Sequence, residues 1–74
     1  MKSGEAVRLI MNNKDISVTK LADRMGRSSR LVCDRIAAKN IIMNNLAEML
    51  RVMDYKIVVV PSDTKLQDDW FEID

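Results

Sequence analysis

The sequence predicts a small, mainly α domain of four to five helices with a C-terminal β-strand or β-hairpin. The chain has 74 residues, 47% hydrophobic and 31% charged, which suits a single hydrophobic core. Four segments before residue 54 place apolar side chains at helical spacing. At Tyr55 the apolar period changes to that of a strand. Because a chain this small buries only about 60% of its unfolded surface, we expect it to gain stability from a partner.

The first two helices are defined by their caps and apolar positions. Ser3 is the expected N-cap of the first helix, which ends within residues 12–15. Ser17 is the expected N-cap of the second, which ends at Gly26 because glycine adopts positive φ without strain. The apolar positions are Ala6, Val7, Leu9, Ile10 and Met11 in the first helix and Val18, Leu21, Ala22 and Met25 in the second.

The third and fourth helices follow after short connections. Ser28 or Ser29 caps the third helix, and the fourth spans about residues 43–53, with Asp54 ending it in the left-handed conformation. The inward positions are Leu31, Val32, Ile36 and Ala37 in the third helix, and Met43, Leu46, Met49, Leu50 and Met53 in the fourth.

The segment from Tyr55 to Val60 is expected to be a strand, closed by Pro61. Residues 70–73 provide a second candidate strand, which would complete a hairpin. Residues 1–61 therefore form the expected domain, and residues 62–74 an acidic tail. Both strand faces are mostly apolar, so we expect a second copy to cover one of them. The expected dimer interface consists of Tyr55, Ile57, Val58, Val59 and Val60.

Composition excludes several functions. The chain has no histidine and one cysteine, so it lacks an imidazole base and a Cys-type zinc site. We expect no enzymatic activity, no metal and no cofactor. Apolar runs stay far below the roughly 18 residues of a membrane span, and no apolar signal-peptide core follows Met1. We therefore expect a cytoplasmic protein without membrane contact.

The net charge of +1 conceals a strong asymmetry. Residues 1–60 carry eleven basic and six acidic side chains, a net +5, whereas residues 61–74 carry one basic and five acidic side chains, a net −4. Within residues 20–39, six basic side chains face two acidic ones, a net +4. This excess favours a phosphate-bearing partner such as nucleic acid; the alternative is an ordinary solvated helix surface.

The two short helices around Gly26 have the pattern of a helix-turn-helix. Ala22, four residues before the glycine, lets the helices approach closely. Three segments extend this pattern: Ser17-Val-Thr-Lys-Leu-Ala-Asp-Arg-Met-Gly26, Arg27-Ser-Ser-Arg-Leu-Val-Cys-Asp-Arg-Ile36 and Ala38-Lys-Asn-Ile41. They closely resemble the Cro/phage-repressor (XRE-type) helix-turn-helix family. The resemblance covers about residues 5–60. It departs from the family at Arg27, Ala38, Ile42 and Asp54, and most strongly at Arg27, where an aliphatic side chain is usual.

This resemblance implies a homodimeric transcriptional regulator, a repressor of phage or mobile-element type, that binds double-stranded DNA. Arg30 would donate to guanine O6 and N7. The base-reading residues implied are Ser29, Arg30, Cys33 and Asp34, and the phosphate-contacting residues are Ser17, Lys20, Arg27, Ser28, Lys39 and Asn40.

Plainer interpretations exist for several of these residues. Ser28 and Ser29 could serve only as helix caps, Arg30 and Asp34 only as an i, i+4 surface pair, and Cys33 only as an exposed thiol. The alternative function is a mobile-element-encoded, protein-binding inhibitor, such as an anti-CRISPR or other anti-defence protein, that reuses the same fold. Its partner would bind the acidic tail. Enrichment of a palindromic sequence from random duplexes would distinguish the two functions.

Overall fold

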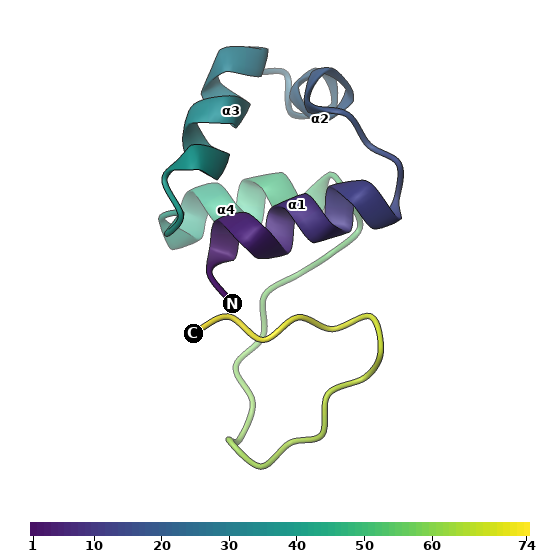
Figure 1. The fold of residues 1–74 in the computed structure, drawn as a ribbon, viewed down its shortest axis with the longest axis vertical. Helices are drawn as coiled ribbons and strands as arrows, with labels where there is room; N and C mark the ends of the chain where they lie inside the picture. The colour runs from purple at the N-terminus through teal and green to yellow at the C-terminus, as the bar shows by residue number, and fades with distance from the viewer.

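The computed structural model describes residues 1–74 as a small, mainly helical domain. Its four helices are α1 (Ser3–Asn13), α2 (Val18–Met25), α3 (Ser29–Ala37) and α4 (Met43–Arg51). Helices α2 and α3 form one end of the molecule, α1 and α4 lie side by side across the middle, and the segment after α4 forms the opposite end (Figure 1). The molecule measures 38 × 22 × 16 Å.

The α2–α3 pair has the predicted caps. The Ser17 hydroxyl oxygen accepts a hydrogen bond from the Lys20 amide at 3.1 Å, and that of Ser28 accepts one from the Leu31 amide at 3.2 Å. Gly26 ends α2 with φ of 68°, the left-handed conformation expected of it. A turn of three residues, 26–28, therefore joins the two helices.

Ser3 does not have the predicted capping role. The N-cap position of α1 belongs to Lys2, whose side chain makes no capping hydrogen bond. Ser3 is instead buried, where its hydroxyl donates to the Lys39 carbonyl at 3.1 Å and accepts from the Ile41 amide at 2.7 Å. The Gly4 amide donates to the same Lys39 carbonyl at 2.8 Å. The start of α1 is thus fastened to the loop that follows α3.

The core draws on all four helices and agrees with most predicted inward positions. Leu9, Ala37 and Met43 are exceptions, because all three side chains are exposed, Met43 by 67%; Ala37 lies in the last turn of α3, beyond the residues that face the core. Ala22 is buried between α2 and its neighbours, as expected for a close approach of helices. The core residues are Val7, Ile10, Met11, Ile16, Leu21, Ala22, Val32, Ile36, Leu46, Met49, Leu50 and Met53.

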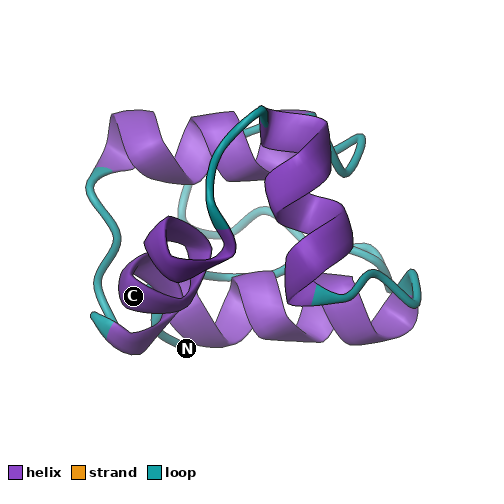
Figure 2. Ribbon diagram, turned by 90° about the horizontal axis from the view of Figure 1, so that it is seen from above, coloured by secondary structure: helices purple, strands orange, loops and turns teal.

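The predicted C-terminal strands are not present. Helix α4 ends at Arg51, two residues before its predicted end, and Asp54 adopts the predicted left-handed conformation with φ of 64°. Residues 55–74 contain no strand, and the ribbon shows helices and loops alone (Figure 2). The backbone groups of residues 56–60 make no hydrogen bond within the chain. A β-branched sequence favours the extended conformation but needs a neighbouring strand to form a ladder, and a lone hairpin is only marginally stable in water. The single chain supplies no such neighbour.

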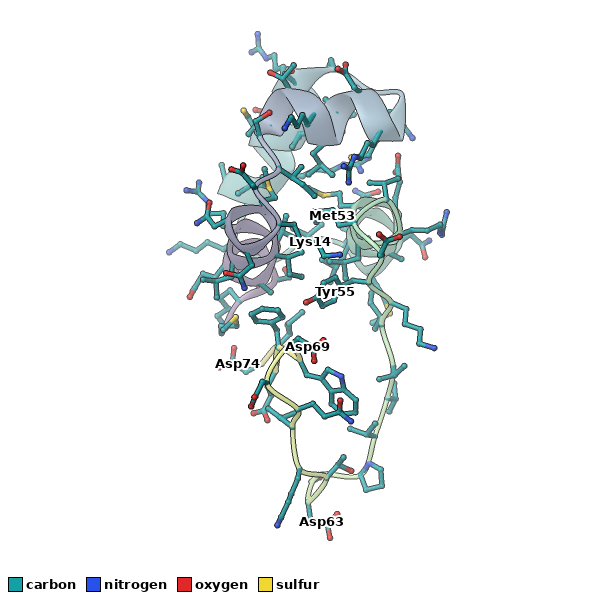
Figure 3. The ribbon with its side chains drawn as sticks, turned by 90° about the vertical axis from the view of Figure 1, so that its right-hand side faces the viewer. Lys14, Met53, Tyr55, Asp63, Asp69 and Asp74 are labelled. Carbon is teal, nitrogen blue, oxygen red and sulfur yellow. The ribbon has the colours of Figure 1, made fainter.

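The C-terminal segment is held by side-chain contacts instead (Figure 3). The rings of Tyr55 and Phe71 lie 6.1 Å apart between centroids, and both pack against the core. The Tyr55 hydroxyl donates to the Asp69 carbonyl at 3.0 Å. Lys14 lies over the Tyr55 ring, 5.4 Å from its centroid, and the Asp74 amide donates to the Met1 carbonyl at 3.0 Å. The segment closes back on the helices as an irregular loop.

Candidate nucleic-acid interface

The outer face of α3 carries the four predicted base-reading residues. Ser29, Arg30, Cys33 and Asp34 are all exposed; Arg30 and Asp34 lie opposite the buried Val32 and Ile36, whereas Cys33 lies at the flank of the helix and Ser29 lies in the first turn on the side of Val32. The helical period places them on adjoining positions of one surface. This surface lies at the end of the molecule that α2 and α3 form (Figure 1).

Arg30 has no partner within the chain. None of the four ion pairs involves it, and it makes no side-chain hydrogen bond. The alternative in which Arg30 and Asp34 form a surface ion pair is therefore not realised. All five N–H donors of the Arg30 guanidinium therefore have no acceptor within the chain.

The first turn of α3 adds donors next to Arg30. The amides of Ser29 and Arg30 have no acceptor in the chain, because the Ser28 side chain caps only the Leu31 amide. Ser28 and Ser17 accept hydrogen bonds as caps, but each hydroxyl hydrogen is still free to donate to another acceptor. A capping role and a phosphate-contacting role are thus compatible in these two residues.

The predicted phosphate-contacting residues lie on three segments: the beginning of α2, the turn before α3 and the loop after it. All six are exposed. Lys39 adopts a positive φ of 61°, and its carbonyl is occupied by Ser3 and Gly4. Its backbone is therefore fixed while its side chain is exposed.

Arg27 does not stand free, and its partner is a residue that the sequence did not single out. The Arg27 Nε donates to Glu48 Oε2 at 3.1 Å, and Arg35 Nη1 donates to Glu48 Oε1 at 3.1 Å. The hydrogen bond from Arg35, together with the charge of Arg27, holds the pKa of Glu48 below its ordinary value. No sequence pattern indicated this contact, because Glu48 belongs to α4 and lies 21 residues from Arg27.

The basic surface is consequently smaller than its composition suggests. Arg27 and Arg35 share Glu48, and Arg24 Nη1 donates to the Val52 carbonyl at 3.2 Å. The predicted basic residues without such partners are Lys20, Arg30 and Lys39. These three side chains make no ion pair or side-chain hydrogen bond within the chain, whereas Arg24 keeps its full charge at a neutral carbonyl and Arg27 and Arg35 together keep one net positive charge beside Glu48.

A shallow hollow adjoins this surface along the contact between α1 and α3. Arg8 lines both this hollow and a second, neighbouring one. Nothing in the local sequence around Arg8 distinguishes it from other solvated arginines. The first hollow is lined by Arg8, Met11, Asn12, Val18, Cys33 and Ile36.

The predicted dimer residues divide into two groups. Tyr55 and Ile57 are half-buried against the helices, while Val58, Val59 and Val60 are exposed. The exposure of Val59 reaches 97%, although period two would place it with Tyr55 and Ile57. The chain therefore leaves three consecutive valines unpacked.

No protein-family model, curated protein or solved structure matches this chain. No cluster of three or more His, Cys, Asp or Glu side chains could hold a metal ion, and no helix is long and apolar enough to cross a bilayer.

Proposed function

We propose that this protein binds double-stranded DNA sequence-specifically as a homodimeric transcriptional regulator, a repressor of phage or mobile-element type. The observation that carries the proposal is the exposed outer face of α3, on which the unpaired Arg30 lies among short polar side chains. A helix that follows a tight turn and presents such a face fits the major groove. Occupation of an operator would then block access of the polymerase.

The proposed base contacts follow from the side-chain chemistry of this face. Arg30, in the first turn of α3, is able to donate two hydrogen bonds to guanine O6 and N7, which provide about 1–3 kcal/mol of discrimination. Ser29 is able to donate to or accept from a base edge. Asp34 accepts from cytosine N4, and Cys33 is small enough to contact a thymine methyl group.

The proposed phosphate contacts come from Ser17, Lys20, Arg27, Ser28, Lys39 and Asn40. Their backbones are fixed by the caps, by the turn and by the hydrogen bonds from Ser3 and Gly4 to Lys39. A fixed backbone lowers the entropic cost of binding. These contacts would set the register of α3 on the duplex without reading its sequence.

The distribution of charge along the molecule supports the same orientation on DNA. The acidic segment of residues 62–74 lies at the opposite end of the long axis from α2 and α3 (Figure 1). In this arrangement its carboxylates are kept away from the phosphates. They also do not cover the basic residues of α2 and α3 in the same chain.

The exposed valines support the homodimer. The unpaired backbone of residues 56–60 would gain a ladder of hydrogen bonds by pairing with the same segment of a second copy. The strand that the single chain lacks would then form in the dimer. A two-fold axis would relate the two α3 helices, which would read half-sites about 34 Å apart.

One observation favours a second candidate, the protein-binding inhibitor of mobile-element origin. Leu66, Trp70 and Ile73 are large, exposed apolar residues, and they lie among the acidic side chains of the tail. Such a surface suits a basic and apolar patch on a partner protein. In that case the α3 face would have no role in DNA recognition.

Selection from a pool of random duplexes separates the two candidates. The full chain should enrich a palindromic sequence, and Arg30→Ala should lose the preference for one base pair in each half-site. The tail change Trp70→Ala serves as the matched control and should leave the enriched sequence unchanged. If the chain enriches no sequence, the regulator proposal fails and the inhibitor is favoured.

A further inference from the structure

Glu48 joins two arginines that come from different parts of the fold. Its Oε2 accepts from Nε of Arg27, in the turn before α3, and its Oε1 accepts from Nη1 of Arg35, in the last turn of α3, both at 3.1 Å. Glu48 itself belongs to α4. The carboxylate therefore ties both ends of α3 to the helix behind it.

The two arginines differ in how much of each side chain is accessible. The Arg35 side chain is 13% exposed, whereas that of Arg27 is 48% exposed. Arg27 uses only Nε in the chain, so both of its terminal nitrogens are still without an acceptor. Arg35 thus completes the packing of α3, while Arg27 is held at one atom and has two donor groups available.

Held in this way, Arg27 is prepared to bind an oxyanion. A free arginine side chain loses rotamer freedom when it is immobilised in a complex, at a cost of about 0.5–1.5 kcal/mol. The ion pair with Glu48 already restricts that freedom. Arg27 also precedes Ser28, the N-cap of α3, so an anion bound there would lie near the positive end of the helix dipole.

We propose that Glu48 is a positioning residue for DNA binding: it orients the Arg27 guanidinium so that the two terminal nitrogens donate to a backbone phosphate beside the turn of residues 26–28. This inference rests on the proposed function. It explains how a charged side chain serves at a position where the helix-turn-helix pattern expects an aliphatic one. Glu48 would contribute to affinity although its own negative charge repels DNA.

Two other roles for Glu48 make different predictions. If Glu48 only stabilises the fold, its loss weakens DNA binding whether or not Arg27 is present. If Glu48 only adds a repulsive charge, its loss strengthens binding in both cases. A positioning role alone makes the effect of Glu48 depend on Arg27.

A double-mutant cycle on the full chain tests this dependence. Binding of the selected duplex is measured for the wild type, Glu48→Gln, Arg27→Ala and the double variant. We expect Glu48→Gln to weaken binding by about threefold to tenfold in the wild-type background, the factor that corresponds to freeing one rotamer-rich side chain. In the Arg27→Ala background the same change should leave binding unchanged or strengthen it slightly. Asp63→Asn, which removes one carboxylate at the far end of the molecule, is the charge control and should leave binding unchanged.

The outcomes separate this inference from the proposed function. Equal weakening by Glu48→Gln in both backgrounds, or strengthening in both, would overturn the positioning role while DNA binding by the wild type stands. A wild type that binds no duplex would overturn the proposed function and this inference with it. Melting curves of the four proteins show whether each is folded at the temperature of the titration. If Glu48→Gln proves unfolded there, the cycle is repeated with Glu48→Asp, whose shorter carboxylate keeps the charge but does not reach Arg27 as well, and the same dependence on Arg27 is expected.

Discussion

Gly4 lies so close to α3 that a Cβ atom at this position would come within 2.7 Å of the Ile36 carbonyl oxygen and 3.2 Å of the Lys39 carbonyl oxygen. Both contacts involve backbone, which is unable to move aside as the end of a side chain does. The Gly4 amide also donates to the Lys39 carbonyl. This approach sets the position of α3 against α1, and α3 carries the candidate base-reading residues.

Gly4→Ala should therefore destabilise the protein. Alanine normally favours a helix over glycine by up to about 1 kcal/mol, but the clash with two carbonyl groups should cost about 1–3 kcal/mol. Since each 1 kcal/mol corresponds to about 4–8 °C in a domain of this size, thermal melting should show a clear loss. Glu5→Ala, a change at the neighbouring exposed position, is the control and should melt like the wild type. A Gly4→Ala protein as stable as the wild type would contradict the close approach.

The Glu48 ion pairs predict a specific dependence of stability on pH. The folded state holds the pKa of Glu48 below its ordinary value of 4.5, chiefly through the hydrogen bond from Arg35. A lowered pKa stabilises the fold at pH values above the ordinary value and loses this effect as the pH falls through the folded value. The stability difference between the wild type and Glu48→Gln should thus be present at pH 7 and shrink as the pH falls below the ordinary value of 4.5. A difference that stays constant from pH 7 to pH 3 would show that the carboxylate charge is not what stabilises the fold.

Some of these features could be predicted from the sequence and others could not. Ser17, Gly26 and Ser28 were placed correctly because a cap or a left-handed turn depends on a few neighbouring residues. Ser3 was assigned a local capping role, whereas its partners lie 36 and 38 residues away. Contacts between residues so far apart in the sequence are set by tertiary packing, and the local spacing of residue types does not indicate them.

The missing strand and the Glu48 ion pairs were also not predictable, because both depend on contacts outside the local sequence. Residues 55–60 have the composition of a strand, but a ladder also needs a partner that the single chain lacks. Glu48 lies on the polar side of α4, where it resembles any solvated acid, and only the fold brings it to Arg27 and Arg35. The exposure of Arg30 and Asp34 was easier to predict, because the helical period places both residues opposite Val32 and Ile36.

Val58→Lys should disrupt the dimer. A charged side chain in the exposed valine segment would oppose its own copy across the two-fold axis, and like charges directly opposite each other destabilise a strand pair. Light scattering should then report a monomer, and operator binding should weaken. Leu9→Lys, which places the same charge on an exposed position of α1, should remain dimeric. If the Val58→Lys protein stays a dimer, the dimer interface does not include this segment.

Phe71→Ala should loosen the C-terminal segment without affecting DNA recognition directly. It removes the ring that packs against Tyr55 and the core, and aromatic pairs contribute about 0.5–1.5 kcal/mol beyond the area they bury. We expect a lower melting temperature and faster amide exchange in residues 54–74. Ile73→Ala is the matched control, because Ile73 is largely exposed, and it should cause a smaller loss. Equal losses in the two variants would contradict the packing role of Phe71.

In the proposed mode of recognition Arg30 reads a base, while Lys39 contacts only the phosphate backbone. The most direct measurement titrates the wild type, Arg30→Ala and Lys39→Ala against the selected duplex and against variants of it that each change one base pair. Arg30→Ala should lose about 1–3 kcal/mol of discrimination at one base pair in each half-site. Lys39→Ala should weaken binding to every duplex by a similar factor. It should also reduce the slope of log affinity against log salt concentration by about one, the amount that corresponds to one lost phosphate contact. If the two variants weaken all duplexes alike and the base preferences stay as in the wild type, Arg30 does not read sequence and the proposed recognition through α3 is wrong.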